Sequence, residues 1–284
     1  MHGELAELVA LAAYGSSFLA RPADAEPPEL FPAGSVFRFT NTVEFRRRTR
    51  RLAVIPVQHL VGRACAPWYA DLRRRGATAI RLGRGDATPR NRELASYIEA
   101  GFSGGLDAAV VVQFGDGRRE LWSGHWAVTE REHPEQRIWC VTFTGVSTSE
   151  TLFEGPTLNA AAHRLRAALD AAASLAAGRP YFGNWERVFR DALALLDSES
   201  PSVPYHPDLL PPERYGIESW RLLAAAGRAW VFGGMGSWTD VAMDDEPSYE
   251  PVTTELFDAV LDAVLAATNT RAESATSVHG PAPY

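Results

Sequence analysis

Alternating apolar and polar residues predict several strands in the first half of the chain. Within the second run, Pro56 favours a position at the edge of a sheet. Asp116-Gly117 is a hairpin signal, and the short links between the last three runs predict an antiparallel meander. The six β-rich runs are residues 35–45, 52–61, 77–82, 107–114, 119–128 and 137–146.

Helical spacing of apolar residues appears at the start of the chain and dominates after about residue 155. Residues 4–14 predict a short amphipathic helix that docks on the main body. In the last predicted helix, Phe257, Val260, Leu261, Val264 and Leu265 share one face, as expected for packing on a core. The expected helices cover residues 4–14, 66–76, 90–100, 157–177, 184–197, 217–230 and 255–269.

This order of elements predicts an α+β protein, in which a mixed sheet with an antiparallel three-strand meander precedes a mainly α-helical C-terminal portion. The sequence suggests four regions. They are an N-terminal helix with a Pro-rich linker (1–34), a mixed α/β sheet region (35–150), a helical region packed on the sheet or separate (151–269) and a disordered tail (270–284).

Composition narrows the chemistry more than it identifies it. All 28 basic side chains are arginine, a usage typical of GC-rich bacterial genomes. Walker phosphate loops, pyridoxal Schiff bases and protein-kinase ATP sites each need a lysine amine, so these sites are excluded and no cofactor is expected. The two cysteines, the lack of a long apolar run and the acidic N-terminus predict a soluble cytoplasmic protein that does not enter membranes.

The arginines are concentrated in one stretch of a protein whose formal net charge is −7. Residues 46–92 carry 13 Arg and two Asp, a net charge of +11, whereas residues 186–284 carry 16 acidic residues and six Arg, a net charge of −10. Because the arginine fork bonds anions bidentately, clustered arginines predict an anion-binding surface. The favoured alternative is that they lie on a solvated face, cap the helix C-terminus at residues 73–75 or pair with the acidic half. The candidates are Arg46, Arg47, Arg48, Arg50, Arg51, Arg73, Arg74 and Arg75.

A glycine loop at residues 230–238 (WVFGGMGSW) is the most distinctive local sequence. Three glycines among bulky apolar residues predict a close approach to the backbone, either by a ligand or by a neighbouring element. The acidic side chains of Asp240, Asp244, Asp245 and Glu246 follow, but their spacing matches no metal-binding loop, and no metal site is predicted. The loop candidates are Gly233, Gly234, Gly236, Trp238 and Asp240.

Residues 101–105 (GFSGG) match the G-x-S-x-G pattern of hydrolases. A predicted helix precedes the motif and a predicted strand follows it, which reverses the order that exposes a nucleophilic serine. A Gly-rich connection into a buried strand is the favoured explanation.

Two functional hypotheses remain. The first is a binding or interaction protein that recognises an acidic or polyanionic partner, either protein or nucleic acid, through its Arg-rich segment. The second is a hydrolase or transferase with a site near the Gly233–Gly236 loop.

Overall fold

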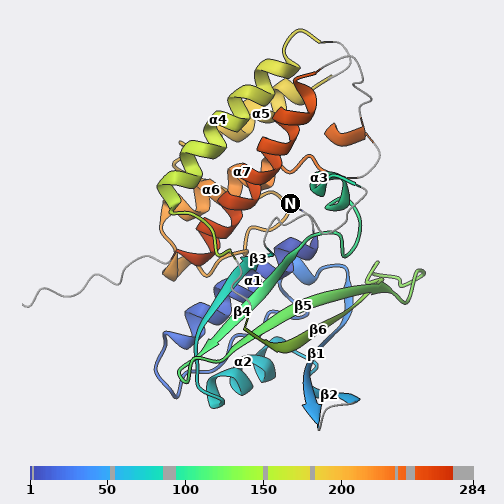
Figure 1. Ribbon diagram of the computed structural model, residues 1–284, viewed down its shortest axis with the longest axis vertical. Helices are drawn as coiled ribbons and strands as arrows, with labels where there is room; N and C mark the ends of the chain where they lie inside the picture. Colours follow the sequence, from blue (N-terminus) through green and yellow to red (C-terminus); the bar gives the residue numbers. More distant parts are fainter. Residues whose placement is uncertain are drawn as a thin grey trace, which may run out of the picture.

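The computed structural model describes residues 1, 3–51, 55–85, 94–149, 153–179, 183–233, 236–240 and 247–270. Helices of the C-terminal half form one end of the molecule, and a six-stranded mixed sheet with the first two helices forms the other (Figure 1). The predicted α+β class is therefore confirmed.

The strands are β1 (Thr40–Arg51), β2 (Ile55–Gly62), β3 (Ala77–Arg84), β4 (Ala108–Phe114), β5 (Arg119–Val128) and β6 (Trp139–Thr148). The α-helices of the described residues are α1 (Gly3–Leu19), α2 (Cys65–Arg74), α3 (Ser96–Glu99), α4 (Leu158–Ala176), α5 (Trp185–Leu195), α6 (Ile217–Arg228) and α7 (Tyr249–Asn269). A helix was expected over residues 90–100, and within the described residues 94–100 the structure has the short helix α3. Residues 271–284 of the expected tail lie outside the described residues.

The strand order is β2-β1-β6-β5-β4-β3, and every neighbouring pair is antiparallel except β1 and β6. The predicted meander is present as β4, β5 and β6. Its first turn forms because Gly117 has a φ of 83° and the Asp116 carboxylate accepts a bond from the Arg118 amide at 3.1 Å.

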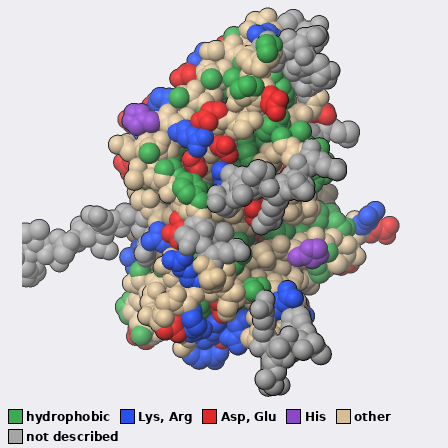
Figure 2. All heavy atoms as spheres, in the orientation of Figure 1, with side chains coloured by type: hydrophobic (Ala, Val, Ile, Leu, Met, Phe, Trp, Pro, Cys, Tyr) green, Lys and Arg blue, Asp and Glu red, His purple; other side chains and the backbone are tan. Residues whose placement is uncertain are grey.

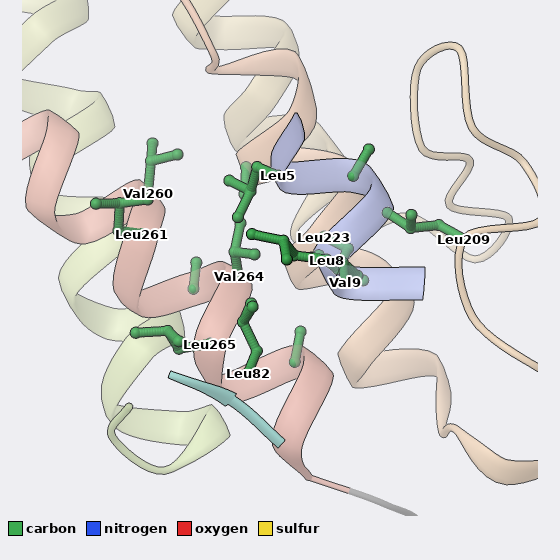
Figure 3. Close-up of a cluster of buried hydrophobic side chains, with 14 of the residues drawn as sticks. Leu5, Leu8, Val9, Leu82, Leu209, Leu223, Val260, Leu261, Val264 and Leu265 are labelled. Carbon is green, nitrogen blue, oxygen red and sulfur yellow. The ribbon is translucent and has the colours of Figure 1, made fainter. Parts of the chain in front are cut away.

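Helix α1 lies between the sheet and the C-terminal helices. Figure 3 shows its Leu5, Leu8 and Val9 among side chains of α6, α7 and β3. The expectation of a short amphipathic helix is wrong, because α1 extends to Leu19 and is buried on nearly every side. Its sequence is apolar all round apart from two glutamates, which suits a central helix better than a peripheral one.

The two glutamates of α1 are themselves buried, and each has hydrogen-bonding partners. Glu4 accepts bonds from the Ser103 hydroxyl at 2.6 Å and from the Gly104 amide at 3.0 Å. Glu7 accepts bonds from the Thr40 hydroxyl at 3.1 Å and from the Trp126 indole at 2.7 Å. Burial raises the pKa of the Glu7 carboxyl from its ordinary value of 4.5 to about 8.

Aromatic rings join α2 to one face of the sheet. Phe45 stacks on Trp68 at 4.6 Å and on Phe143 at 5.2 Å, and Trp68 meets Trp122 edge-on at 5.3 Å. The start of α2 is capped from the linker, since the Glu29 carboxylate accepts bonds from the Cys65 and Ala66 amides at 3.0 and 3.1 Å. The Pro-rich linker is thereby fixed to the sheet region.

The β3 edge of the sheet is covered by the end of α7. The Asn269 side chain accepts a bond from the Leu82 amide at 2.8 Å and donates one to the Leu82 carbonyl at 2.8 Å. These two bonds imitate a neighbouring strand, so this edge is protected from further pairing. Among the described residues, no helix or strand pairs in this way with the outer edge of β2.

Candidate functional site

The alternation of β1 sends its arginines to opposite faces of the sheet. Arg46 and Arg48 share a face with Glu44, whereas Arg47 lies on the face of Phe45, which packs against α2. The backbone of Arg50 and Arg51 continues β1 along β2, and their side chains lie outside the described residues. The arginine block is therefore divided between two faces rather than gathered on one.

The face that carries Arg46 and Arg48 is open at its β1, β6 and β5 end. The described helices with the most extensive contacts to the sheet are α1, α2 and α7, and they contact it through the opposite face or the β3 edge. At the β3 end, Glu154 bonds Gln113 at 3.1 Å and pairs with Arg81 at 3.3 Å, so the segment before α4 covers that end.

Hydroxyl groups and one histidine line the open part beside the arginines. In register, Arg46 adjoins Thr144, which adjoins Ser123, and Thr142 adjoins His125. We call the set Arg46, Arg48, Ser123, His125, Thr142 and Thr144 the polar face. Its side chains are hydrogen-bond donors at neutral pH, which suits contact with carboxylate or phosphate oxygens.

The two arginines of the polar face differ in their partners. Arg46 pairs with Glu44 at 2.6 Å, and Glu44 also pairs with Arg63 at 3.1 Å. The hydrogen bond from Arg46 is the main reason that the pKa of Glu44 is lowered. Arg48 is exposed and forms no ion pair with any described residue.

The arginines that end α2 have structural roles. Arg73 lies over the Phe18 ring at 3.5 Å and donates to the Phe18 carbonyl and to carbonyls of the following linker. Arg74 pairs with Asp71 at 2.5 Å, and Arg75 pairs with the buried Glu120. They lie on the helix side of the sheet, so the structure does not bring them together with Arg46 and Arg48.

The basic and acidic regions do not neutralise each other. Among the described ion pairs, Arg84 with Asp258 at 3.1 Å is the single one that joins residues 46–92 to residues 186–284. The acidic helices are instead paired with arginines of α4, for example Arg164 with Glu255 at 2.7 Å. Figure 2 shows basic side chains gathered over the sheet end, where Figure 1 places α2. The charge polarity of the sequence is thus retained in three dimensions.

The glycine loop is approached by another part of the backbone. A Cβ on Gly233, whose φ is 89°, would lie 2.3 Å from the Cα of Gly101. Trp238 is fully buried, and the Asp240 carboxylate accepts a bond from the Gly236 amide at 2.9 Å. Gly234 and residues 241–246 lie outside the described residues.

Gly233 and Gly236 of the glycine loop line a cavity of about 590 Å³. Trp185, Tyr205 and Trp230 also line it. Trp238 and Asp240 do not line it, nor does a histidine or a carboxylate of the described residues. The sequence pointed to this place through its glycines, but the aromatic residues that form the walls come from distant segments.

Ser103 of the G-x-S-x-G pattern lies between α3 and β4, and its hydroxyl donates to Glu4. In the described part of the chain, no histidine bonds this serine, and no group of three or more His, Cys, Asp or Glu side chains is placed to hold a metal ion. The motif thus ties the loop before β4 to α1, which agrees with a connection into a buried strand.

No helix of the described residues has the length and hydropathy that crossing a bilayer requires. Comparison with protein families, with curated proteins and with solved structures finds no match to this chain.

Proposed function

We propose that this chain is a binding protein that docks an extended acidic segment of a partner polypeptide along β2, beside the arginines of the polar face. The observation that carries the proposal is the position of Arg48, which is exposed on the open face one strand away from the free edge. An added strand at this edge lies about 10 Å from β1, a distance that an arginine side chain and a glutamate side chain span together.

The edge itself supports a polypeptide as the partner. Peptides commonly extend a sheet by pairing with an exposed edge strand, which supplies affinity through main-chain hydrogen bonds. Gln58 and His59 of β2 are exposed, and Leu60 is 43% exposed. The β3 edge lacks this capacity because Asn269 occupies it.

The overall charge favours a short acidic segment over a long nucleic acid. The formal net charge is −7, and the acidic C-terminal half would repel a polyanion that extends beyond the polar face. A short segment along β2 meets Arg46 and Arg48 without reaching that half. The segment supplies the carboxylates, and the arginines supply paired N–H donors.

The two cysteines agree with a location in a reducing compartment. Cys65 and Cys140 are both free thiols, and burial raises the pKa of Cys65 well above its usual value, which makes that thiol unreactive. We propose the cytoplasm as the location on this basis.

A catalytic site at the Gly233–Gly236 loop is less well supported, because no described side chain lining the cavity is a histidine or a carboxylate.

Fluorescence anisotropy tests the proposal with a labelled (Glu-Thr)4 peptide, its neutral (Gln-Thr)4 analogue and a random single-stranded oligonucleotide. We expect the acidic peptide to bind at low salt and to be released as salt rises, and the neutral analogue to bind more weakly. Absence of peptide binding at low salt would refute the proposal, and tighter binding of the oligonucleotide would favour nucleic acid instead.

A pair of double variants locates the site. Arg46→Gln with Arg48→Gln is expected to weaken acidic-peptide binding about tenfold or more. Arg166→Gln with Arg190→Gln removes two arginines of the helical end, each paired with one exposed aspartate, and is expected to leave binding unchanged. Equal losses in both variants would show that the attraction is general rather than local.

A further inference from the structure

The cavity beside the glycine loop lies at the helical end of the molecule, away from the polar face. The start of α5, the end of α6 and the segments around residues 205 and 232 enclose it. Its volume of about 590 Å³ falls within the range of small-molecule sites.

Aromatic side chains form the walls of the cavity, and other aromatic rings pack against them. Trp185 meets the buried Trp238 edge-on at 6.4 Å, and Phe232 meets Phe257 edge-on at 5.0 Å. Trp230 meets Phe232 nearly at a right angle, at 5.7 Å. Because these contacts fix the rings in position, the cavity is formed before any ligand enters.

Tyr205 stands at the rim in an unusual conformation. The residue is 88% exposed, and its φ is 67°, a value that residues other than glycine seldom adopt. An exposed aromatic ring held in a strained backbone at the mouth of an aromatic cavity is an arrangement expected of a binding site.

A guanidinium supplies hydrogen-bond donors at the cavity. Arg228 lines it and donates from one Nη to Asp191 at 2.7 Å, the one partner of this guanidinium in the described part of the chain. A guanidinium has five N–H donors, so it retains capacity for a second anion.

We propose that this cavity binds a planar aromatic molecule that carries a carboxylate. The rings of Trp185, Trp230 and Phe232 pack on the aromatic part of the ligand, and Arg228 bonds the carboxylate. This site does not depend on the polar face, because the two are built from different elements.

Isothermal titration calorimetry with 2-naphthoate and with its neutral analogue 2-naphthamide tests the ligand class. We expect saturable binding of 2-naphthoate, and about tenfold weaker binding of it by Arg228→Gln, with no change for 2-naphthamide. Arg187→Gln, an exposed neighbour that does not line the cavity, is the matched control and is expected to behave as the wild type. Equal effects of Arg228→Gln on both ligands, or no binding of 2-naphthoate at millimolar concentration, would overturn the proposal.

A second variant locates the site independently of charge. Val188 lines the cavity and is half-buried, so Val188→Trp fills the cavity volume without replacing a core residue. We expect it to abolish binding of both ligands while thermal unfolding stays cooperative. Val146→Trp, at an exposed position of the sheet, is expected to retain both affinities. Retention of binding by Val188→Trp would place the ligand elsewhere and overturn the proposal.

Discussion

Replacing Glu7 by glutamine isolates the contribution of one buried carboxyl to folding. The pKa of Glu7 rises from 4.5 to about 8 on folding because burial penalises its charged form. The stability that the neutral Glu7 carboxyl gives the folded state is complete below pH 4.5. It declines as the pH rises and is lost by about pH 8. Each pH unit within this interval corresponds to about 1.4 kcal/mol, so the loss is at most about 5 kcal/mol.

Glutamine is able to satisfy the same neighbours without a charge. Its carbonyl oxygen can accept the Trp126 indole N–H, and its amide can donate to the Thr40 hydroxyl, which accepts as readily as it donates. Glu4 on the preceding turn raises the pKa of Glu7 further, and its own contacts with Ser103 and Gly104 remain in the variant.

Urea denaturation followed by tryptophan fluorescence at pH 5, 7 and 9 measures the effect. We expect the variant to be more stable than the wild type at pH 9 by about 3–5 kcal/mol, and to differ from it by about 1 kcal/mol or less at pH 5. Glu135→Gln, which changes an exposed carboxylate, is the control and is expected to follow the wild type. A variant that loses stability with pH as the wild type does would refute the assignment of this dependence to Glu7.

Two other substitutions test the packing. Asn269→Ala removes both bonds to Leu82 and a third to the Glu154 carbonyl, and is expected to lower the free energy of unfolding by about 2 kcal/mol in urea. Asn184→Ala, which loses no side-chain capping bond, is expected to change it by less than about 0.5 kcal/mol. Similar losses from the two would argue against edge protection. Gly101→Val brings a side chain to 2.6 Å from the Cα of Gly233 and is expected to cost about 2 kcal/mol or more in the same assay, and a neutral effect would disprove the close approach.

The sequence predicted the local parts of the fold. The alternation of apolar residues and the Asp116-Gly117 turn gave the meander, and the apolar face of the last helix is buried in α7 as expected. Partners that are distant along the chain were not predictable. The parallel pairing of β1 with β6 and the central position of α1 both depend on which apolar surfaces meet, and a single sequence does not specify this.

In the candidate site, too, partners that are distant along the chain were not predictable. Strand alternation separates Arg47 from Arg46 and Arg48, but the first strand expected from the sequence ended at residue 45, before these arginines, whereas β1 continues to Arg51. The separate position of Arg73 depends on the face that α2 covers, and its partners are carbonyls of a linker that carries no signal for such contacts. Likewise, the buried role of Glu7 was hidden, since a glutamate near the N-terminus suggests exposure.

Hydrogen–deuterium exchange of the backbone amides, with and without saturating (Glu-Thr)4 peptide, tests the docking proposal most directly. A strand added at the free edge gives new partners to the outward amides of β2. We therefore predict slower exchange in β2 on peptide binding, with no change in β3, whose edge Asn269 already covers. Unchanged exchange in β2 at saturation, or protection confined to the helical end, would contradict docking along β2.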